Sequence, residues 1–203
     1  MTQVLKPEVR RRIEAASLRC FAERGYVATS MAAIAAEAGT ATANTYRYFT
    51  SKQALFDAVV PPELPARHDA LLDRRIAALA DGTPASGEAA RELLEFWLDH
   101  RLPVVVLLDR DSGTRHDGYG QTFVERLVRH AVATLPTVPS EEDQEVLRVV
   151  FDNTRRAIAR LLLSSRDREH ARALVAGFWS YQLPGLDGLL AHISSREGDR
   201  PLA

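Results

Sequence analysis

The stretch that decides the fold is "GTATANTYRYF", residues 39–49. It opens with a glycine and continues with small residues and threonines. Three aromatic residues, Tyr46, Tyr48 and Phe49, then fall within four positions. A helix built from this stretch has small side chains in its first half and aromatic rings in its second half. The residues on either side of the stretch indicate what such a helix is for.

The residues around this stretch predict four short helices before Pro61-Pro62. Apolar residues recur with the helical period of 3.6 residues. A first helix is expected over about 7–23 and ends at Gly25, and Thr29 or Ser30 can cap a second helix. After Gly39, a third helix covers about 42–48, and Ser51 can cap a fourth. Two short helices joined by a tight glycine turn, behind a longer helix, form a helix-turn-helix unit, whose second helix enters the major groove of DNA.

Two interpretations of the third helix remain open on pattern alone. In the first, short side chains let the helix approach base edges; these are Thr40, Ala41, Thr42, Ala43 and Asn44. The hydroxyls of Tyr46 and Tyr48 then reach phosphate while their rings cover the domain core, and Phe49 is buried. In the second, the unit is a helical hairpin with an aromatic cluster in its core and no nucleic-acid partner.

The charge distribution is weakly asymmetric. The chain has 203 residues and a formal net charge of −1. Residues 1–60 carry a net charge of +3, from eight Lys/Arg and five Asp/Glu, and the remaining residues carry −4. A basic N-terminal part on an acidic body is compatible with a polyanionic partner, and equally with ordinary solvated helix faces.

Over about 50 residues, the sequence resembles the DNA-binding domain of the tetracycline-repressor (TetR) family. The shared pattern consists of Ala15-Ala16, Phe21, Gly25-Tyr26, Thr29-Ser30, Ile34-Ala35, Ala38-Gly39, Tyr46-Arg47-Tyr48-Phe49 and Ser51-Lys52, without a gap. The resemblance implies a dimeric regulator, usually a repressor, that a small molecule releases from double-stranded operator DNA. The expected partners are therefore a palindromic operator, an effector of unknown identity and a second copy of the chain.

The resemblance also implies roles for single residues. Thr29 and Ser30 would cap the second helix and touch phosphate. The recognition face would consist of Thr42, Ala43, Asn44 and Arg47, next to Thr40. Tyr46, Tyr48 and Lys52 would bind the DNA backbone.

The chain departs from the family pattern at three positions. Ala41 stands where a hydroxyl usually caps the third helix, so Thr40 or Thr42 substitutes for it, or the helix starts one residue late. Ala43 replaces a glycine and Thr45 replaces a leucine or isoleucine. A buried Thr45 hydroxyl would need a hydrogen-bond partner.

The rest of the chain predicts a larger helical part, for an all-α protein of about nine helices. Helices are expected at about 63–80, 86–100, 101–109, 119–134, 140–165 and 167–193. We expect a three-helix DNA-binding domain over 1–50 and a ligand-binding and dimerisation domain over 51–203, linked by the helix from Ser51. The last two helices carry wide apolar stripes, which suit a monomeric core and, through the resemblance, a four-helix dimer interface.

A ligand pocket is expected among the middle helices, where aromatic residues alternate with a few polar ones. The candidate lining residues are Phe96, Trp97, His100, Arg101, Tyr119, Phe123, Phe151, Arg155 and Trp179. Ordinary core packing or a surface position is the competing interpretation for each. The segment "HRLPVVVLLDRD", residues 100–111, reads either as a cavity mouth with ionisable groups or as a buried helix with solvated ends.

Enzyme activity has little support, and no cofactor or metal is expected. The six histidines form no metal-binding motif, and there is neither a GxSxG motif nor a P-loop. Nothing fixes His100, Asp109 and Ser112 as a catalytic triad. An all-helical enzyme and a helical protein-interaction module remain rival hypotheses. The single cysteine, Cys20, is expected in the core, and without a signal peptide or an apolar run long enough to span a membrane, we expect a cytoplasmic protein.

Overall fold

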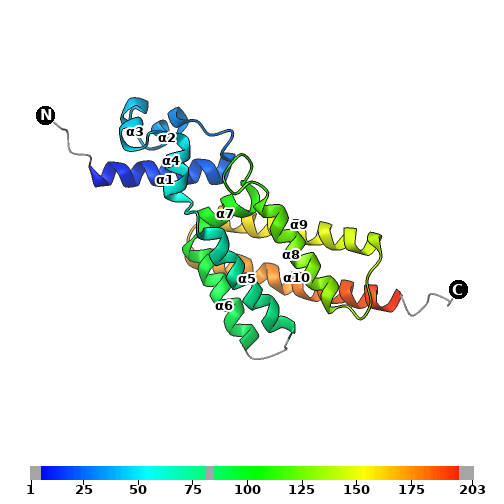
Figure 1. Cartoon of the computed structure of the whole chain (residues 1–203). Coiled ribbons are helices and arrows are strands. Elements are labelled where there is room, and N and C mark those ends of the chain that lie inside the picture. The colour runs from blue at the N-terminus through cyan, green and yellow to red at the C-terminus, as the bar shows by residue number, and fades with distance from the viewer. Residues whose placement is uncertain (1–5, 81–84, 197–203) are drawn as a thin grey trace.

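The computed structural model describes residues 6–80 and 85–196. These residues form α-helices joined by turns, without a strand among them, which confirms the all-α fold class. Figure 1 shows a small N-terminal head next to a larger helical body.

The head contains four helices whose ends follow from the capping residues. They are α1 (Pro7–Arg24), α2 (Met31–Glu37), α3 (Thr42–Tyr48) and α4 (Lys52–Val59). The Ser30 hydroxyl accepts a hydrogen bond from the Ala33 amide (3.1 Å), and the Ser51 hydroxyl accepts one from the Ala54 amide (3.0 Å). Both bonds satisfy a first-turn amide that has no partner within its helix. Gly25 follows α1 with a φ of 82°, which a glycine adopts without strain.

The core of the head forms where α1 packs against α2 and α4. Its fully buried side chains include Ile13, Cys20, Phe21, Ile34, Leu55 and Phe56. The Phe21 and Phe56 rings meet edge to face with their centroids 5.4 Å apart, and Tyr26 closes the cluster 5.2 Å from Phe56. Cys20 is 1% exposed, as expected for a small core residue, and burial raises the pKa of its thiol.

The body contains six further helices close to the expected ranges. They are α5 (Leu64–Ala80), α6 (Ala85–Asp99), α7 (Arg101–Asp109), α8 (Tyr119–Thr134), α9 (Glu141–Ser164) and α10 (Arg168–Arg196). Helices α5 and α6 pack on each other, and α9 packs against α8 and α10. Figure 1 shows the α5–α6 pair on one side of the body and α9 above α10 on the other.

Helix α7 is the centre of the body. Its residues from Val104 to Leu108 are all buried, and α7 packs against α6, α8, α9 and the head helix α1. The segment "HRLPVVVLLDRD" is therefore a buried helix, as in the simpler of its two interpretations, but its first residue, His100, also lines a cleft. Helix α8 approaches α7 closely at Gly120, where an added Cβ would lie only 2.7 Å from the Leu108 carbonyl oxygen.

Helix α9 carries two apolar rows that differ in burial. The inner row is buried in the body and consists of Leu147, Phe151, Ile158 and Leu162. The outer row is only partly covered: Val146 is 45% exposed, and Val150, Ala157 and Leu161 are half-buried. Helix α10 likewise buries Ala171 and Val175 but leaves Tyr181 76% exposed. Several apolar side chains of α9 and α10 are thus only partly covered by the rest of the described chain.

Candidate nucleic-acid interface and ligand cleft

Helix α3 lies on the surface of the head that is turned away from the body (Figure 1). Its N-cap residue, Ala41, makes no side-chain capping bond, so the helix starts at Thr42 without the expected hydroxyl cap. Thr45 is the buried residue of this helix, and its hydroxyl donates to the Ala41 carbonyl oxygen (3.4 Å). That bond supplies the partner that a buried threonine at this position requires.

The expected recognition face is accessible along α3. Ala43 and Arg47 are exposed, and Thr42 and Asn44 are half-buried. The Asn44 amide Nδ2 donates to the Thr40 hydroxyl oxygen (2.8 Å). Because an amide nitrogen carries two hydrogens, one N–H and the carbonyl oxygen of Asn44 remain for another partner. Thr40 therefore orients Asn44 and does not cap the helix.

The aromatic half of the stretch divides between surface and core. Tyr46 is 48% exposed, whereas Phe49 is 4% exposed and belongs to the core of the head. The Arg10 guanidinium lies 4.8 Å from the centroid of the Phe49 ring. The Tyr48 hydroxyl accepts a hydrogen bond from the Lys6 backbone amide (3.0 Å), which ties the start of α1 to α3.

Thr29 and Ser30 differ in where their hydroxyls point. Ser30 is exposed and caps α2. Thr29 is 2% exposed, and its hydroxyl donates to the Gly25 carbonyl oxygen (2.7 Å) inside the loop between α1 and α2. The phosphate contact expected of the Thr29 hydroxyl thus has no support in this geometry, because that hydroxyl is already bonded away from solvent.

Lys52 has a structural role that its sequence position does not indicate. Its Nζ donates to the carbonyl oxygens of Tyr26 (2.8 Å) and Thr29 (3.0 Å), and it lies 4.1 Å from the centroid of the Tyr26 ring. An ammonium group has three hydrogens, so one is left for an anion. Lys52 therefore fastens the α1–α2 loop to the start of α4 while remaining next to the surface that carries α3.

The candidate ligand residues of the body lie in several places instead of lining one pocket. Phe96 and His100 belong to an open cleft of about 360 Å³ between α5 and α6. Trp97, Tyr119 and Phe123 lie deeper and surround a histidine, His68.

The remaining candidates serve as structural contacts. Arg101 donates to the backbone and the hydroxyl of Ser165 (2.9 and 3.0 Å). Phe151 is buried in the core, and Arg155 is buried against the Leu108 carbonyl and the Asp152 carboxylate. The half-buried Trp179 packs on its neighbour Phe178.

His68 is the centre of a buried hydrogen-bonded chain. The Trp97 indole N–H donates to His68 Nε2 (2.9 Å), and His68 Nδ1 lies 2.7 Å from the Tyr119 hydroxyl. The Tyr119 hydroxyl donates to the Asp69 carboxylate (2.6 Å), which pairs with Arg126 at 3.0 Å. Because Nε2 accepts, the neutral ring carries its hydrogen on Nδ1. Desolvation by burial, with a smaller effect of Arg126, lowers the pKa of His68 to about 4.

His68 was not among the sequence candidates, although one signal pointed to it. It lies four residues after Leu64 and four before Leu72, and all three are buried on one face of α5. A histidine within an apolar row of this period must find partners in the core. The cleft residues Arg67 and Leu71 were missed as well, because no periodicity distinguishes a cleft wall from an ordinary helix surface.

The head and the body meet where α1 packs against α7, and also at α4 and the loop before α8. The Arg115 guanidinium pairs with the Asp57 carboxylate of α4 (3.3 Å), and the His116 ring lies 6.1 Å from Phe56 between centroids. Gly113 approaches the α1–α2 loop closely, since an added Cβ would lie 2.6 Å from a Val27 methyl group. A movement of the loop before α8 would therefore change its contacts with the head.

Two kinds of feature are absent from residues 6–80 and 85–196. No helix there combines the length and the apolar character needed to cross a membrane. No group of three or more His, Cys, Asp and Glu side chains among them could hold a metal ion.

Comparison with known proteins places the head in a family. Residues 13–59 match the family model described as bacterial regulatory proteins, tetR family. This range contains most of α1 and all of α2, α3 and α4. No curated protein matches the chain.

Two solved structures are similar over most of the chain. One is a tetR-family transcriptional regulator from Streptomyces coelicolor, with 19% identity, a TM-score of 0.41, and coverage of 98% of this chain and 92% of that one. The other is a protein assigned to the tetR family of transcription regulators, from Shewanella sp. PV-4, with 21% identity, a TM-score of 0.40, and coverage of 85% and 96%. The match over residues 13–59 agrees with the helix-turn-helix geometry of the head, so this segment of the chain is similar to bacterial regulatory proteins of the tetR family.

Proposed function

We propose that the chain is a dimeric, ligand-responsive transcriptional repressor, which binds a palindromic operator and is released by a small organic molecule. The observation that carries the proposal is the outer face of α3. This face is built from short side chains, Ala43 is exposed, and Asn44 is held in one orientation by Thr40. A face of this kind lets a helix approach base edges in the major groove.

The contacts with DNA are proposed residue by residue. Thr42, Ala43, Asn44 and Arg47 face the base edges, and Thr40 acts through Asn44. Ser30, Tyr46, Tyr48 and Lys52 lie around this face and bind phosphate. Thr29 contributes by holding the α1–α2 loop, because its hydroxyl is bonded inside that loop.

The partly covered face of α9 and α10 supports a dimer with a second copy of the chain. Val149 is 52% exposed and Tyr181 is 76% exposed, on helices that otherwise pack in the body. A two-fold dimer would place two recognition helices on half-sites about one turn of DNA apart. The variant Tyr181→Asp should therefore be a monomer by light scattering. The same change at Val138, an equally exposed residue (77%) between α8 and α9, should leave the dimer intact.

The effector would act from the body on the head. We propose residues 1–50 as the DNA-binding domain and residues 51–203 as the ligand-binding and dimerisation domain, with α4 as the link. The Arg115–Asp57 pair and the His116–Phe56 contact join the body to α4 and supply a route between them. A ligand that favours another position of this loop would change the position of α4 and thereby the affinity for DNA.

The proposal is tested by a gel shift with the DNA upstream of the chain's own gene. Retarded DNA that resists competition by random DNA supports a regulator. Binding that random DNA abolishes at equal concentration would contradict operator recognition. No catalytic step is part of the proposal.

A further inference from the structure

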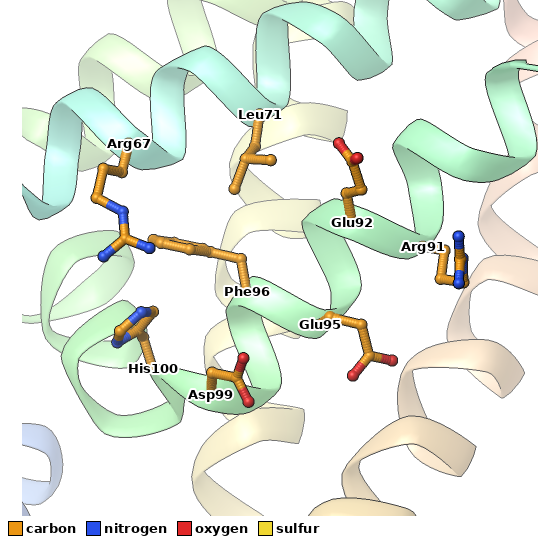
Figure 2. A pocket seen from close by; sticks show the side chains of 8 residues that line it. All are labelled: Arg67, Leu71, Arg91, Glu92, Glu95, Phe96, Asp99 and His100. Carbon is orange, nitrogen blue, oxygen red and sulfur yellow. The ribbon is translucent and has the colours of Figure 1, made fainter.

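The cleft between α5 and α6 is lined by acidic and basic side chains and by an aromatic ring. It has a volume of about 360 Å³ and is lined by Arg67, Leu71, Arg91, Glu92, Glu95, Phe96, Asp99 and His100. Figure 2 shows that Arg67, Phe96 and His100 gather at one end, while Arg91 and Glu92 lie on the far side. A volume of this size suits a molecule of one or two rings.

Two of the three carboxylates in the cleft form ion pairs with arginines of α10. Glu95 pairs with Arg172 at 2.5 Å and also with Arg168, and Asp99 pairs with Arg168 at 2.5 Å. The hydrogen bonds from Arg172 and Arg168 lower the pKa of Glu95, which fits a carboxylate held in its charged form. These two carboxylates are therefore poor partners for a cationic ligand, because each already has an arginine.

The third carboxylate and the second arginine of the cleft are paired as well. Glu92 pairs with Arg74 on α5 (3.0 Å), and Arg91 lies 3.7 Å from Glu88 on its own helix. Neither group leaves an unbalanced charge at the side of the cleft where it lies.

Arg67 is different from the other charged groups of the cleft. Within residues 6–80 and 85–196, no carboxylate forms an ion pair with it, and its guanidinium lies 5.5 Å from the centroid of the Phe96 ring. The His100 ring also packs against the Phe96 ring, and the two ring centroids lie 4.7 Å apart. Burial, together with the charge of Arg67, lowers the pKa of His100, so its ring is neutral and has one N–H to donate.

We propose that this cleft binds a planar, ring-containing carboxylate, with the carboxylate on Arg67 and His100 and the ring near Phe96 and Leu71. The assignment rests on the proposed function, in which such a molecule is the effector. A guanidinium donates two parallel hydrogen bonds to a carboxylate, and it already stacks on the ring that would form the floor of the site.

The test is calorimetric titration of the full chain without DNA, using three probes of one shape: naphthoate, naphthamide and naphthylmethylamine. We expect naphthoate to bind at least about tenfold more tightly than the amide, and the amine to bind least, since a charge-assisted bond is about twice as strong as a neutral one. Arg67→Gln should remove the preference for naphthoate. Arg129→Gln, which changes an exposed arginine on α8 outside the cleft, should retain it.

Each other outcome contradicts the assignment. Equal binding of naphthoate and naphthamide, tightest binding of the amine, or no heat from any probe would overturn it. Unchanged naphthoate binding in Arg67→Gln, with a helical content like that of wild type by circular dichroism, would do the same. Release of DNA by naphthoate is measured separately. Binding in the cleft without an effect on DNA would contradict the effector role and leave the ligand class supported.

Discussion

At the scale of single residues, the hydrogen bond from Asn44 to Thr40 is the feature of the head most directly connected with specificity. It fixes the Asn44 amide in the unbound protein, so less side-chain entropy would be lost in the proposed complex with DNA. Asparagine can pair with adenine through one donor and one acceptor, and both remain on Asn44 after the bond to Thr40 is made.

We therefore expect Asn44→Ala to lower affinity for the preferred operator by about 1–3 kcal/mol and to change binding to random DNA much less. Fluorescence anisotropy with both DNAs measures the difference. Binding-site selection with the variant is the decisive comparison: if it returns the wild-type motif, Asn44 does not read bases.

Lys52 has an observed structural role and a proposed contact with phosphate, and one substitution tests both. Lys52→Ala should weaken binding to all sequences alike and should lower the dependence of log affinity on log salt by roughly 0.9 for each phosphate that Lys52 contacts. It should also destabilise the head by about 1–3 kcal/mol, because the Tyr26 and Thr29 carbonyls lose a charged donor. A lower melting temperature with an unchanged salt dependence would show that Lys52 only fastens the loop.

His68 makes the stability of the body depend on pH. Its pKa is about 4 in the fold and about 6.5 in the unfolded chain, so the unfolded state binds more protons between these values. The contribution of the neutral ring is complete above pH 7 and is lost as the pH falls, by about 2 kcal/mol between pH 7 and pH 5.

Denaturant unfolding at both pH values tests this dependence. His68→Gln should be less stable than wild type at pH 7 but should lose less stability on acidification. The exposed His192 serves as the control, since His192→Gln should keep the wild-type dependence. Parallel curves for wild type and His68→Gln would mean that another group carries the acid sensitivity.

At the scale of elements, the sequence predicted helix positions well because local signals set them. Ser30, Ser51 and Gly25 fix helix ends by their own chemistry, whatever the rest of the chain does. The role of Lys52 and the hydrogen bonds of His68 depend on partners that are distant in the sequence. Lys52 and Thr29 are 23 residues apart, and His68 and Trp97 are 29 residues apart. Pattern alone does not specify such partners, and the candidate ligand residues were dispersed for the same reason.

Gly120 illustrates a contact between elements that only the structure reveals. An added Cβ would lie 2.7 Å from the Leu108 carbonyl and 3.1 Å from the Arg155 guanidinium, so α8 would have to move away from α7. Gly120→Ala should therefore destabilise the protein by about 1–3 kcal/mol, despite the higher helix propensity of alanine. Gly177→Ala on α10, where an added Cβ meets nothing within 4 Å, is the matched control in thermal unfolding. Equal stability of the two variants would contradict the close approach of α8 to α7.

At the scale of the whole molecule, three surfaces would act together. The outer face of α3 would bind DNA, the partly covered face of α9 and α10 would bind a second copy, and the α5–α6 cleft would bind the effector. The contacts of α4 with the loop before α8 lie between the head and the body and connect these roles. Because coupling is reciprocal, an effector that weakens DNA binding must itself bind less tightly to the DNA-bound protein.

The central claim is sequence-specific binding of a dimer to DNA, and selection of binding sites from a random DNA pool with the full chain tests it most directly. We expect an inverted repeat whose half-sites lie about one helical turn apart, centre to centre. Recovery of no enriched sequence, or of a single unrepeated half-site, would contradict it.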